Sequence, residues 1–239
     1  MIRTVPETGS TNADLAARLA GGEFVPEGEW LVADRQTAGK GRQGRTWFDG
    51  HGNFMGSTVI RPGPGDPPAT SLALLCGLVL HEVVAPLVPP PARPLLKWPN
   101  DLMIGTAKLA GILLERVGDA VIAGIGVNLA RAPEVQGRET ISLASFGPAP
   151  DRNHFAASLA AQFNLELERW RSFGLDPLIR RWQAAAHPLG TALAVGEPGE
   201  AALEGQFAGL GDDGALQLRL ADGTTQVIHA GEVRLAGGQ

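Results

Sequence analysis

The sequence predicts an α+β protein that consists of one large domain and a small, all-β C-terminal unit. Helix-like and strand-like segments are mixed along residues 1–187, whereas from Pro188 short alternating apolar runs are separated by turns rich in Gly and Asp. At 239 residues the chain is long for one average domain and short for two. We therefore expect a main domain over residues 1–187 and a small antiparallel barrel over residues 188–239.

Composition excludes several classes of protein. Hydrophobic residues make up 44% and charged residues 19%, which is typical of a globular chain. No uninterrupted apolar run reaches the ~18 residues that span a bilayer, so we expect no membrane association. The first seven residues lack the charged-then-apolar plan of a signal peptide, which favours a cytoplasmic protein. A net charge of -5 argues against a general nucleic-acid surface.

Cysteine and histidine usage indicates no thiol chemistry and no soft-metal site. The one cysteine, Cys76, lies among leucines and is predicted to be a core residue. The five histidines are scattered without the spacing of metal ligands. Any metal is therefore expected to be Mg²⁺ bound by oxygen.

The first helix is predicted over residues 13–20, between a polar run and two glycines. Ser10, Thr11 and Asn12 precede it, and Gly21 and Gly22 end it. One polar residue is enough to cap a helix. Three in succession indicate that this helix start also faces a ligand.

Residues 36–47 are the most informative stretch of the chain. They join two predicted strands, 30–33 and 54–60, and alternate glycine with Lys40, Arg42 and Arg45. Residues 35–45 hold four of the chain's 20 basic residues with no acid between them. Glycine admits close backbone approach and Arg binds carboxylates or phosphates in a bidentate way, so we predict a flexible anion clamp.

Two other interpretations of this stretch stay open from its composition. A Gly/Arg-rich loop is also typical of a solvated linker or of a nucleic-acid-binding arm. A Walker A loop is excluded, because Lys40 is followed by Gly41 and not by Ser or Thr.

The middle of the chain predicts a core helix and then a lysine-bearing hairpin. The apolar residues 72–84 form the helix, which Pro86 ends. After a short strand and a Pro-Asn-Asp turn, a hairpin about residues 105–106 carries Lys108 on its far arm. Lys97 and Lys108 both lie in apolar surroundings, where a buried amine needs an anion from a neighbouring Asp or from a ligand. Gly111 in a strong strand suggests close approach of a bound group.

The next strand, 120–127, ends in Gly-Ile-Gly-Val-Asn. This is a weak dinucleotide fingerprint, because the third glycine and a following helix are missing. Asn128 nevertheless offers a donor and an acceptor to an adenine edge. Helices that begin near Asp151 and Asp176 carry apolar stripes and are predicted to belong to the core. The barrel strands are expected at Thr191–Val195, Ala202–Leu210, Ala215–Leu220, Thr225–Ala230 and Val233–Leu235.

Five motifs in order resemble those of biotin protein ligases: Ser10-Thr11-Asn12, the Gly-Lys-Gly-Arg-Gln-Gly-Arg-Thr-Trp loop, Lys97-Trp98-Pro99-Asn100-Asp101, Lys108 to Leu113, and Gly124 to Asn128. The resemblance implies a class II synthetase-like mixed sheet backed by helices, with an SH3-like C-terminal barrel. It also implies biotin, ATP and Mg²⁺. Biotin would become biotinyl-5′-AMP and then pass to a lysine of a biotin carboxyl carrier domain.

The resemblance further implies roles for individual residues. Arg42 and Lys108 would be catalytic, because they would hold the biotin carboxylate against the α-phosphate, and Asp101 would be a candidate Mg²⁺ ligand. The implied biotin-binding residues are Ser10, Thr11, Asn12, Gln36, Gly39, Lys40, Gly41, Arg42, Lys108 and Gly111. The implied ATP-binding residues are Arg42, Arg45, Trp47, Lys97, Asn100, Asp101, Lys108 and Asn128.

The sequence departs from the family pattern at one cation and at its N-terminus. Lys40 stands where the family usually has Arg, which keeps the charge and loses a bidentate fork. The ligase pattern begins by Glu7, so we expect no N-terminal DNA-binding domain and no repression.

A lipoate ligase is the alternative enzyme, but its Arg-Arg-x-Ser-Gly-Gly-Gly type of motif is absent. A nucleic-acid-binding module would explain the basic loop but not Lys97, Lys108 or Asn128. The acceptor protein and the oligomeric state do not follow from the sequence.

Overall fold

The computed structural model describes residues 1–196 and 202–236, and its main unit is built on a seven-stranded mixed β-sheet. The spatial order is β1-β2-β3-β7-β6-β5-β4. Only β1 and β2 run parallel; the other neighbours are antiparallel. The strands are β1 (Ile2–Thr8), β2 (Trp30–Gln36), β3 (Phe54–Ile60), β4 (Pro94–Lys97), β5 (Asp101–Ile104), β6 (Ala107–Val117) and β7 (Ala120–Val127).

Strand β1 was not predicted from the sequence. It is the edge strand and most of its side chains are exposed, so it lacks the apolar alternation of a half-buried strand. Helix α1 connects it to β2, which allows the two strands to run parallel.

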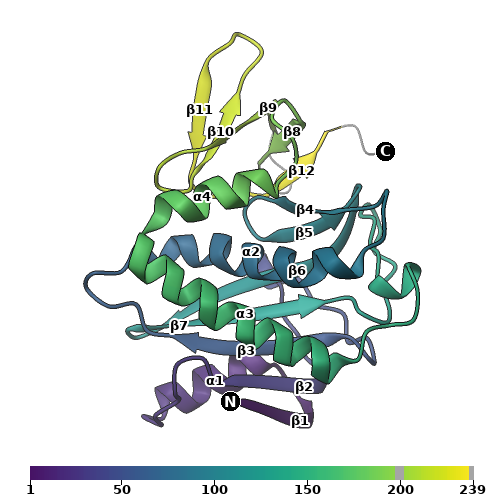
Figure 1. Cartoon of the computed structure of the whole chain (residues 1–239), viewed down its shortest axis with the longest axis vertical. Helices are drawn as coiled ribbons and strands as arrows, with labels where there is room; N and C mark the ends of the chain where they lie inside the picture. Colours follow the sequence, from purple (N-terminus) through teal and green to yellow (C-terminus); the bar gives the residue numbers. More distant parts are fainter. Residues whose placement is uncertain (197–201, 237–239) are drawn as a thin grey trace.

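Helices cover both faces of this sheet, as Figure 1 shows. Helix α1 (Thr11–Ala20) packs on one face, against β3 and β7. Helices α2 (Leu72–Val84), α3 (Arg152–Phe173) and α4 (Leu175–Ala184) form the layer on the other face. Short 3₁₀ turns lie at Arg42–Gly44, Ala69–Ser71, Ala85–Leu87 and Leu143–Ser145.

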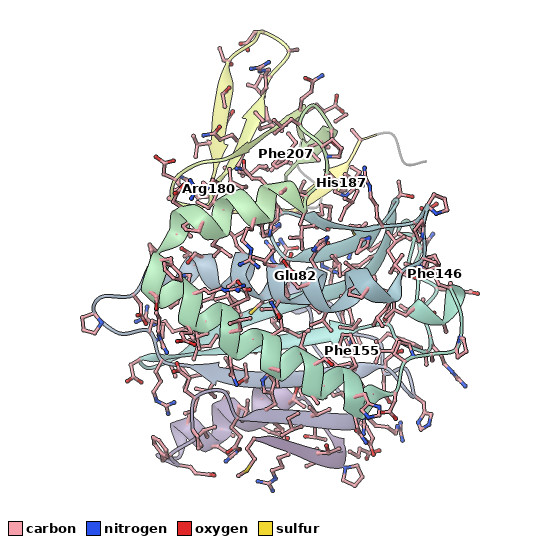
Figure 2. The ribbon with its side chains drawn as sticks, in the orientation of Figure 1. Glu82, Phe146, Phe155, Arg180, His187 and Phe207 are labelled. Atoms are coloured by element: carbon pink, nitrogen blue, oxygen red, sulfur yellow. The ribbon has the colours of Figure 1, made fainter. Side chains whose placement is uncertain are left out.

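The larger core lies between the sheet and the α2–α4 layer. The Trp30 ring packs edge-on against Phe163 at 5.5 Å between centroids, which joins β2 to α3. Phe155 of the same helix contacts Phe54 of β3 (Figure 2). The smaller core under α1 is centred on Leu15, Val59 and Ile122.

The helical stretch Ala69–Leu87 bears on the expectation about membranes. Its 19 residues have a mean hydropathy of 1.7, so by length and composition alone it could cross a bilayer. In the structure α2, which makes up most of this stretch, packs between the sheet, α3 and α4 and buries most of its residues, from Leu74 to Leu80 without a break. A core helix with apolar neighbours on every side has the same composition as a membrane span.

The C-terminal unit is a five-stranded antiparallel sheet in the order β11-β10-β9-β8-β12. Its strands are β8 (Ala192–Val195), β9 (Leu203–Leu210), β10 (Leu216–Arg219), β11 (Thr225–Ile228) and β12 (Val233–Leu235). All five expected strands are present, and the β10–β11 hairpin projects away from the main unit (Figure 1).

The C-terminal sheet is fastened to the main unit by hydrogen bonds and apolar contacts. The Trp98 indole N–H donates to Gly214 O at 3.1 Å, and Leu210 N donates to the Gln183 side chain at 2.8 Å. His187 and Phe207 lie where α4 meets these strands (Figure 2). The C-terminal sheet is therefore held both to Trp98, just after β4, and to α4.

The reactivity of the Cys76 thiol provides a test of this description of the core. Its side chain is fully buried on α2, and burial raises the pKa of the thiol to about 12. We expect iodoacetamide at pH 8 to leave Cys76 unmodified in the folded protein and to alkylate it in 6 M guanidinium. Mass spectrometry after both treatments measures this, and rapid modification of the native protein would contradict the buried placement.

Candidate active site

A cavity of about 480 Å³ opens on the α1 face of the main sheet. Its wall comes from the start of α1, from residues 36–47, from β3, β6 and β7, and from residues 232–233 of the C-terminal unit. It therefore joins segments from nearly the whole length of the chain.

One end of the cavity is neutral and rich in hydrogen-bonding groups. Ser10 begins α1, but its side chain makes no capping bond to the helix. Thr11 N donates to Gln36 Oε1 at 2.7 Å, and Thr11 Oγ1 lies 2.6 Å from Ser57 Oγ. Ser57 in turn donates to Asn12 Oδ1 at 2.5 Å. The polar residues at the start of α1 thus line the cavity. The sequence analysis predicted that they face a ligand, because three polar residues are more than capping the helix needs.

The floor of the cavity is made of glycines on neighbouring strands. A Cβ on Gly126 would lie 2.3 Å from the Trp47 ring, and one on Gly124 would lie 2.2 Å from Asn12 Oδ1. A Cβ on Gly111 would lie 3.0 Å from Lys108 Nζ and 3.2 Å from Trp47. The close approach expected at Gly111 is therefore made by the protein's own side chains. The Gly-Ile-Gly run of β7 likewise gives room to Asn12 and Trp47.

Two lysines and one aspartate form the charged centre of the site. Asp101, at the start of β5, accepts from Lys108 Nζ at 2.5 Å and lies 2.9 Å from Lys97 Nζ. Burial acts to raise the pKa of Asp101, but the two lysines outweigh it and hold that pKa well below its usual range. Burial lowers the pKa of Lys108, and the nearby charges of Lys97 and Arg138 act in the same direction.

This centre answers the question of what neutralises the two lysines. The sequence left two sources open for the anion that the lysines need, a neighbouring Asp or a ligand. In the structure both lysines are paired with a neighbouring Asp, Asp101. Two cations on one carboxylate still leave one positive charge in excess. A ligand anion is therefore attracted to this end of the cavity.

Residues 36–47, which were predicted to form a flexible anion clamp, form a closed hairpin in the structure. Trp47 N donates to Gly39 O at 2.9 Å, and Gly41 N donates to Arg45 O at 2.6 Å. Arg35, which belongs to the basic run in sequence, points away and pairs with Glu7 and Asp49. Lys40 is exposed and lines the cavity, so the Lys-for-Arg departure keeps a cation there and loses the bidentate fork.

The C-terminal unit holds the tip of this hairpin. Arg42 donates to Asn100 Oδ1 at 3.1 Å and to Gly231 O at 3.0 Å. Arg45 and Arg138 each donate to Glu232 Oε1 at 2.7 Å. Burial acts to raise the pKa of Glu232, but Arg45 and then Arg138 outweigh it and lower that pKa. Backbone hydrogen bonds and one shared carboxylate thus close the hairpin over the cavity.

Asn128, just after β7, also lines the cavity. Its Nδ2 donates to Ile141 O at 3.2 Å, whereas its buried Oδ1 has no hydrogen-bond partner among the residues that the structure describes. A buried amide oxygen without a partner is costly unless a ligand supplies a donor.

The residues do not form a protein-built metal site. Asp101 is the one acidic residue at the lysine centre, and both of its oxygens already face ammonium groups. In residues 1–196 and 202–236 no group of three His, Cys, Asp or Glu side chains is arranged to hold a metal. Asp101 therefore does not fit the role of a Mg²⁺ ligand, because its negative charge is already compensated.

The structure brings together all but one of the residues that the sequence singled out. The cavity is lined by Ser10, Thr11, Asn12, Gln36, Lys40, Gly41, Arg42, Arg45, Trp47, Lys97, Asn100, Asp101, Lys108, Gly111 and Asn128. Gly39 is not part of the lining; it lies behind the hairpin, close to the Gln36 amide and Trp47.

The lining residues that the sequence analysis missed include Ser57, Arg138 and Glu232. Ser57 follows Gly56 in an apolar strand, and a buried hydroxyl there is a signal that could have been used. Arg138 and Glu232 lie in loop segments without any motif, and they reach the site only through tertiary contacts.

Comparison with known proteins identifies the family. Residues 10–130 match the Biotin/lipoate A/B protein ligase family, and residues 194–235 match the Biotin protein ligase C terminal domain. A biotin–[acetyl-CoA-carboxylase] ligase of Paracoccus denitrificans is 39% identical over 96% of this chain and 98% of its own length. The chain belongs to the biotin protein ligase family.

Other members support this assignment and share the fold. The protein of the same name from Mycobacterium tuberculosis is 38% identical over 96% of this chain and 86% of its own length. The biotin protein ligase of Aquifex aeolicus, solved with biotin and ATP, superposes with a TM-score of 0.86 at 25% identity, covering 98% and 99% of the two chains. A Leishmania major biotin protein ligase, solved with biotinyl-5-AMP, is 27% identical with a TM-score of 0.63 over 96% and 98%.

Glu232 provides a test of the hairpin contacts. Replacing it by Gln removes the charge that Arg45 and Arg138 share, so the hairpin should open more often. Because a charge-assisted hydrogen bond contributes ~1.5–3 kcal/mol, we expect trypsin to cut after Arg42 or Arg45 roughly tenfold faster in Glu232→Gln.

The control is Glu204→Gln, an exposed change in the same C-terminal unit. Timed digestion followed by mass spectrometry locates and measures the cuts. Equal rates in the wild type and Glu232→Gln would show that Glu232 does not hold the hairpin.

Proposed function

We propose that this chain activates biotin with ATP to biotinyl-5′-AMP and transfers the biotinyl group to a lysine of a biotin carboxyl carrier domain. The observation that carries the proposal is the polarity of the cavity. Its neutral end offers hydroxyl and amide groups, its floor is glycine and Trp47, and its other end is cationic. Biotin has the same order of groups: a cyclic urea, an apolar ring and chain, and a carboxylate.

In the first step two anions must meet. The biotin carboxylate repels the ATP phosphates, and the cationic end of the cavity offsets that repulsion through Lys97, Lys108 and Arg42. A carboxylate oxygen attacks the α-phosphorus, the new O–P bond forms, and the bond to the β-phosphate oxygen breaks, which releases pyrophosphate. Lys108 is held beside Asp101 before the ligands bind, so it needs little reorganisation to donate to the developing charge.

Metal chemistry belongs to the nucleotide in this proposal. We expect Mg²⁺ to enter with ATP, where it neutralises charge on the transferred and leaving phosphates. Its ligands would be phosphate oxygens and water, because Asp101 is already paired with two lysines.

In the second step the acceptor's lysine amine attacks the carbonyl carbon of the mixed anhydride. The C–O bond to the phosphate breaks, AMP leaves, and the amine loses a proton as the amide forms. No nucleophile of the chain is required, and Cys76 is buried on the far side of the sheet. The hairpin closed by Glu232 would shield the anhydride from water until the acceptor docks.

Asn128 favours adenine as the base. One of the two N–H donors of its Nδ2 is used by Ile141 O, whereas its buried Oδ1 can accept a hydrogen bond from a ligand. The exocyclic amino group of adenine supplies the donor that Oδ1 lacks. Guanine presents a carbonyl at that position and would leave two acceptors facing each other.

The test of the proposed function is pyrophosphate exchange. Formation of the adenylate is reversible on the enzyme, so we expect labelled pyrophosphate to enter ATP only when biotin and Mg²⁺ are present. A second arm adds a purified carrier domain and measures its biotinylation by mass. Exchange that is equally fast without biotin, or faster with lipoate, would reject the proposal.

Lys108 tests the charged centre. We expect Lys108→Ala to slow single-turnover adenylation by about 10²–10³-fold, the loss typical of one preorganised charge-stabilising donor. The fold should survive, because Asp101 keeps Lys97 at 2.9 Å. Quenched-flow measurement of biotinyl-5′-AMP gives the rate, and a melting curve checks stability.

The matched control is Arg93→Ala, which removes an exposed cation from the approach to β4. A stable Lys108→Ala protein with near-normal adenylation would show that Lys108 serves only to balance Asp101.

A further inference from the structure

The neutral end of the cavity is connected to a charged residue outside it. Glu115, near the end of β6, accepts a hydrogen bond from Asn12 Nδ2 at 2.6 Å. Asn12 lies buried in the cavity wall, whereas Glu115 is exposed and does not line the cavity. None of the five motifs contains Glu115, and the charge chemistry of the reaction does not use it.

The carboxylate fixes the orientation of the Asn12 amide. A carboxylate can only accept hydrogen bonds, so the Asn12 atom that faces Glu115 must be the NH₂ group. Asn12 Oδ1 is then turned toward Ser57 and Gly124. Because this oxygen can only accept, the contact of 2.5 Å requires that Ser57 donates its hydroxyl proton to it.

The same reasoning sets the next two groups. Ser57 has given its one proton to Asn12, so the single Thr11 hydroxyl proton must serve both Ser57 Oγ at 2.6 Å and Gln36 Oε1 at 3.0 Å. Gln36 is oriented independently, because Thr11 N is a donor and holds Gln36 Oε1 at 2.7 Å. The Gln36 NH₂ group is thereby left to serve a ligand.

The resulting proton order makes this end of the cavity rich in acceptors. Lone pairs of Thr11 Oγ1, Ser57 Oγ and Asn12 Oδ1 stay available, and Gln36 Nε2 is the donor beside them. A cyclic urea carries two N–H donors and one carbonyl acceptor, which is the complementary set. If the Asn12 amide were reversed, an N–H would replace its oxygen and would face the N–H of the ligand.

We propose that Glu115 is a positioning residue that sets the hydrogen-bond polarity of the urea subsite, acting through Asn12 and Ser57. This inference rests on the proposed function, because it takes biotin as the ligand. It assigns Glu115 no contact with substrate. Its effect is confined to the end of the cavity that is remote from Lys108 and the phosphates.

Three substitutions of Glu115 separate this role from a merely structural one. Gln can still accept through its amide oxygen, Ala leaves the Asn12 amide free to reverse, and Lys can only donate and therefore favours the reversed amide. Since one hydrogen bond corresponds to about a tenfold change in affinity, we expect biotin dissociation constants raised less than threefold in Glu115→Gln and about tenfold in Glu115→Ala. The value in Glu115→Lys should rise at least as far as in Glu115→Ala.

The readouts are biotin binding by titration calorimetry without ATP, and pyrophosphate exchange for the KM of each substrate and for kcat. We expect the KM for biotin to follow the dissociation constant, while kcat and the KM for ATP stay within twofold. Glu168→Lys, an exposed change of equal charge on α3, is the control for net charge. Because Glu115 is exposed, we expect its variants to fold, and a melting curve of each variant verifies this.

Three results would overturn the proposal: wild-type biotin affinity in Glu115→Ala, an equal loss in Glu115→Gln and Glu115→Ala, or a parallel rise in the KM for ATP. Failure of the proposed function has a different signature. In that case the wild-type protein itself would neither bind biotin nor show biotin-dependent exchange.

Discussion

One buried carboxylate between two lysines is the constraint on which the site depends. Asp101 makes it possible for Lys97 and Lys108 to remain charged inside an apolar hairpin, because an unpaired ammonium there would be strongly destabilising. The compensation is incomplete, since two cations share one anion. That residual positive charge gives the cavity a cationic end before any ligand arrives. A reaction between two anions, a carboxylate and a phosphate, needs such a preorganised positive charge.

The rest of the fold positions groups around this centre. The antiparallel strands β5, β6 and β7 place Asp101, Lys108 and the floor glycines on one surface, and the missing side chains at Gly111, Gly124 and Gly126 give room to Lys108, Asn12 and Trp47. The helices on the opposite face provide most of the apolar burial. Stability and chemistry are thus divided between the two faces of one sheet.

The C-terminal unit is part of the site and not an independent attachment. Glu232 joins Arg45 of the hairpin to Arg138 of the main unit, and Lys97 donates to Val233 O at 2.8 Å. A displacement of β12 would therefore disturb hydrogen bonds to both the hairpin and the lysine centre. At the other end of the cavity, Glu115, which lies outside the lining, acts on uncharged groups through a chain of hydrogen bonds.

The sequence by itself determined the elements and most of the chemistry. Apolar runs bounded by turn residues predicted β3, α2 and the β5–β6 hairpin, because those segments are largely buried, and buried lysines implied a nearby anion. The sequence did not predict edge strand β1, because most of its side chains are exposed. Only the tertiary structure decided which anion pairs with the lysines, and which distant residues join the site. Arg45 and Glu232 are 187 positions apart, and Asn12 and Glu115 are 103 apart. Such contacts leave no local pattern, because their geometry exists only after the sheet has formed and the C-terminal unit has docked.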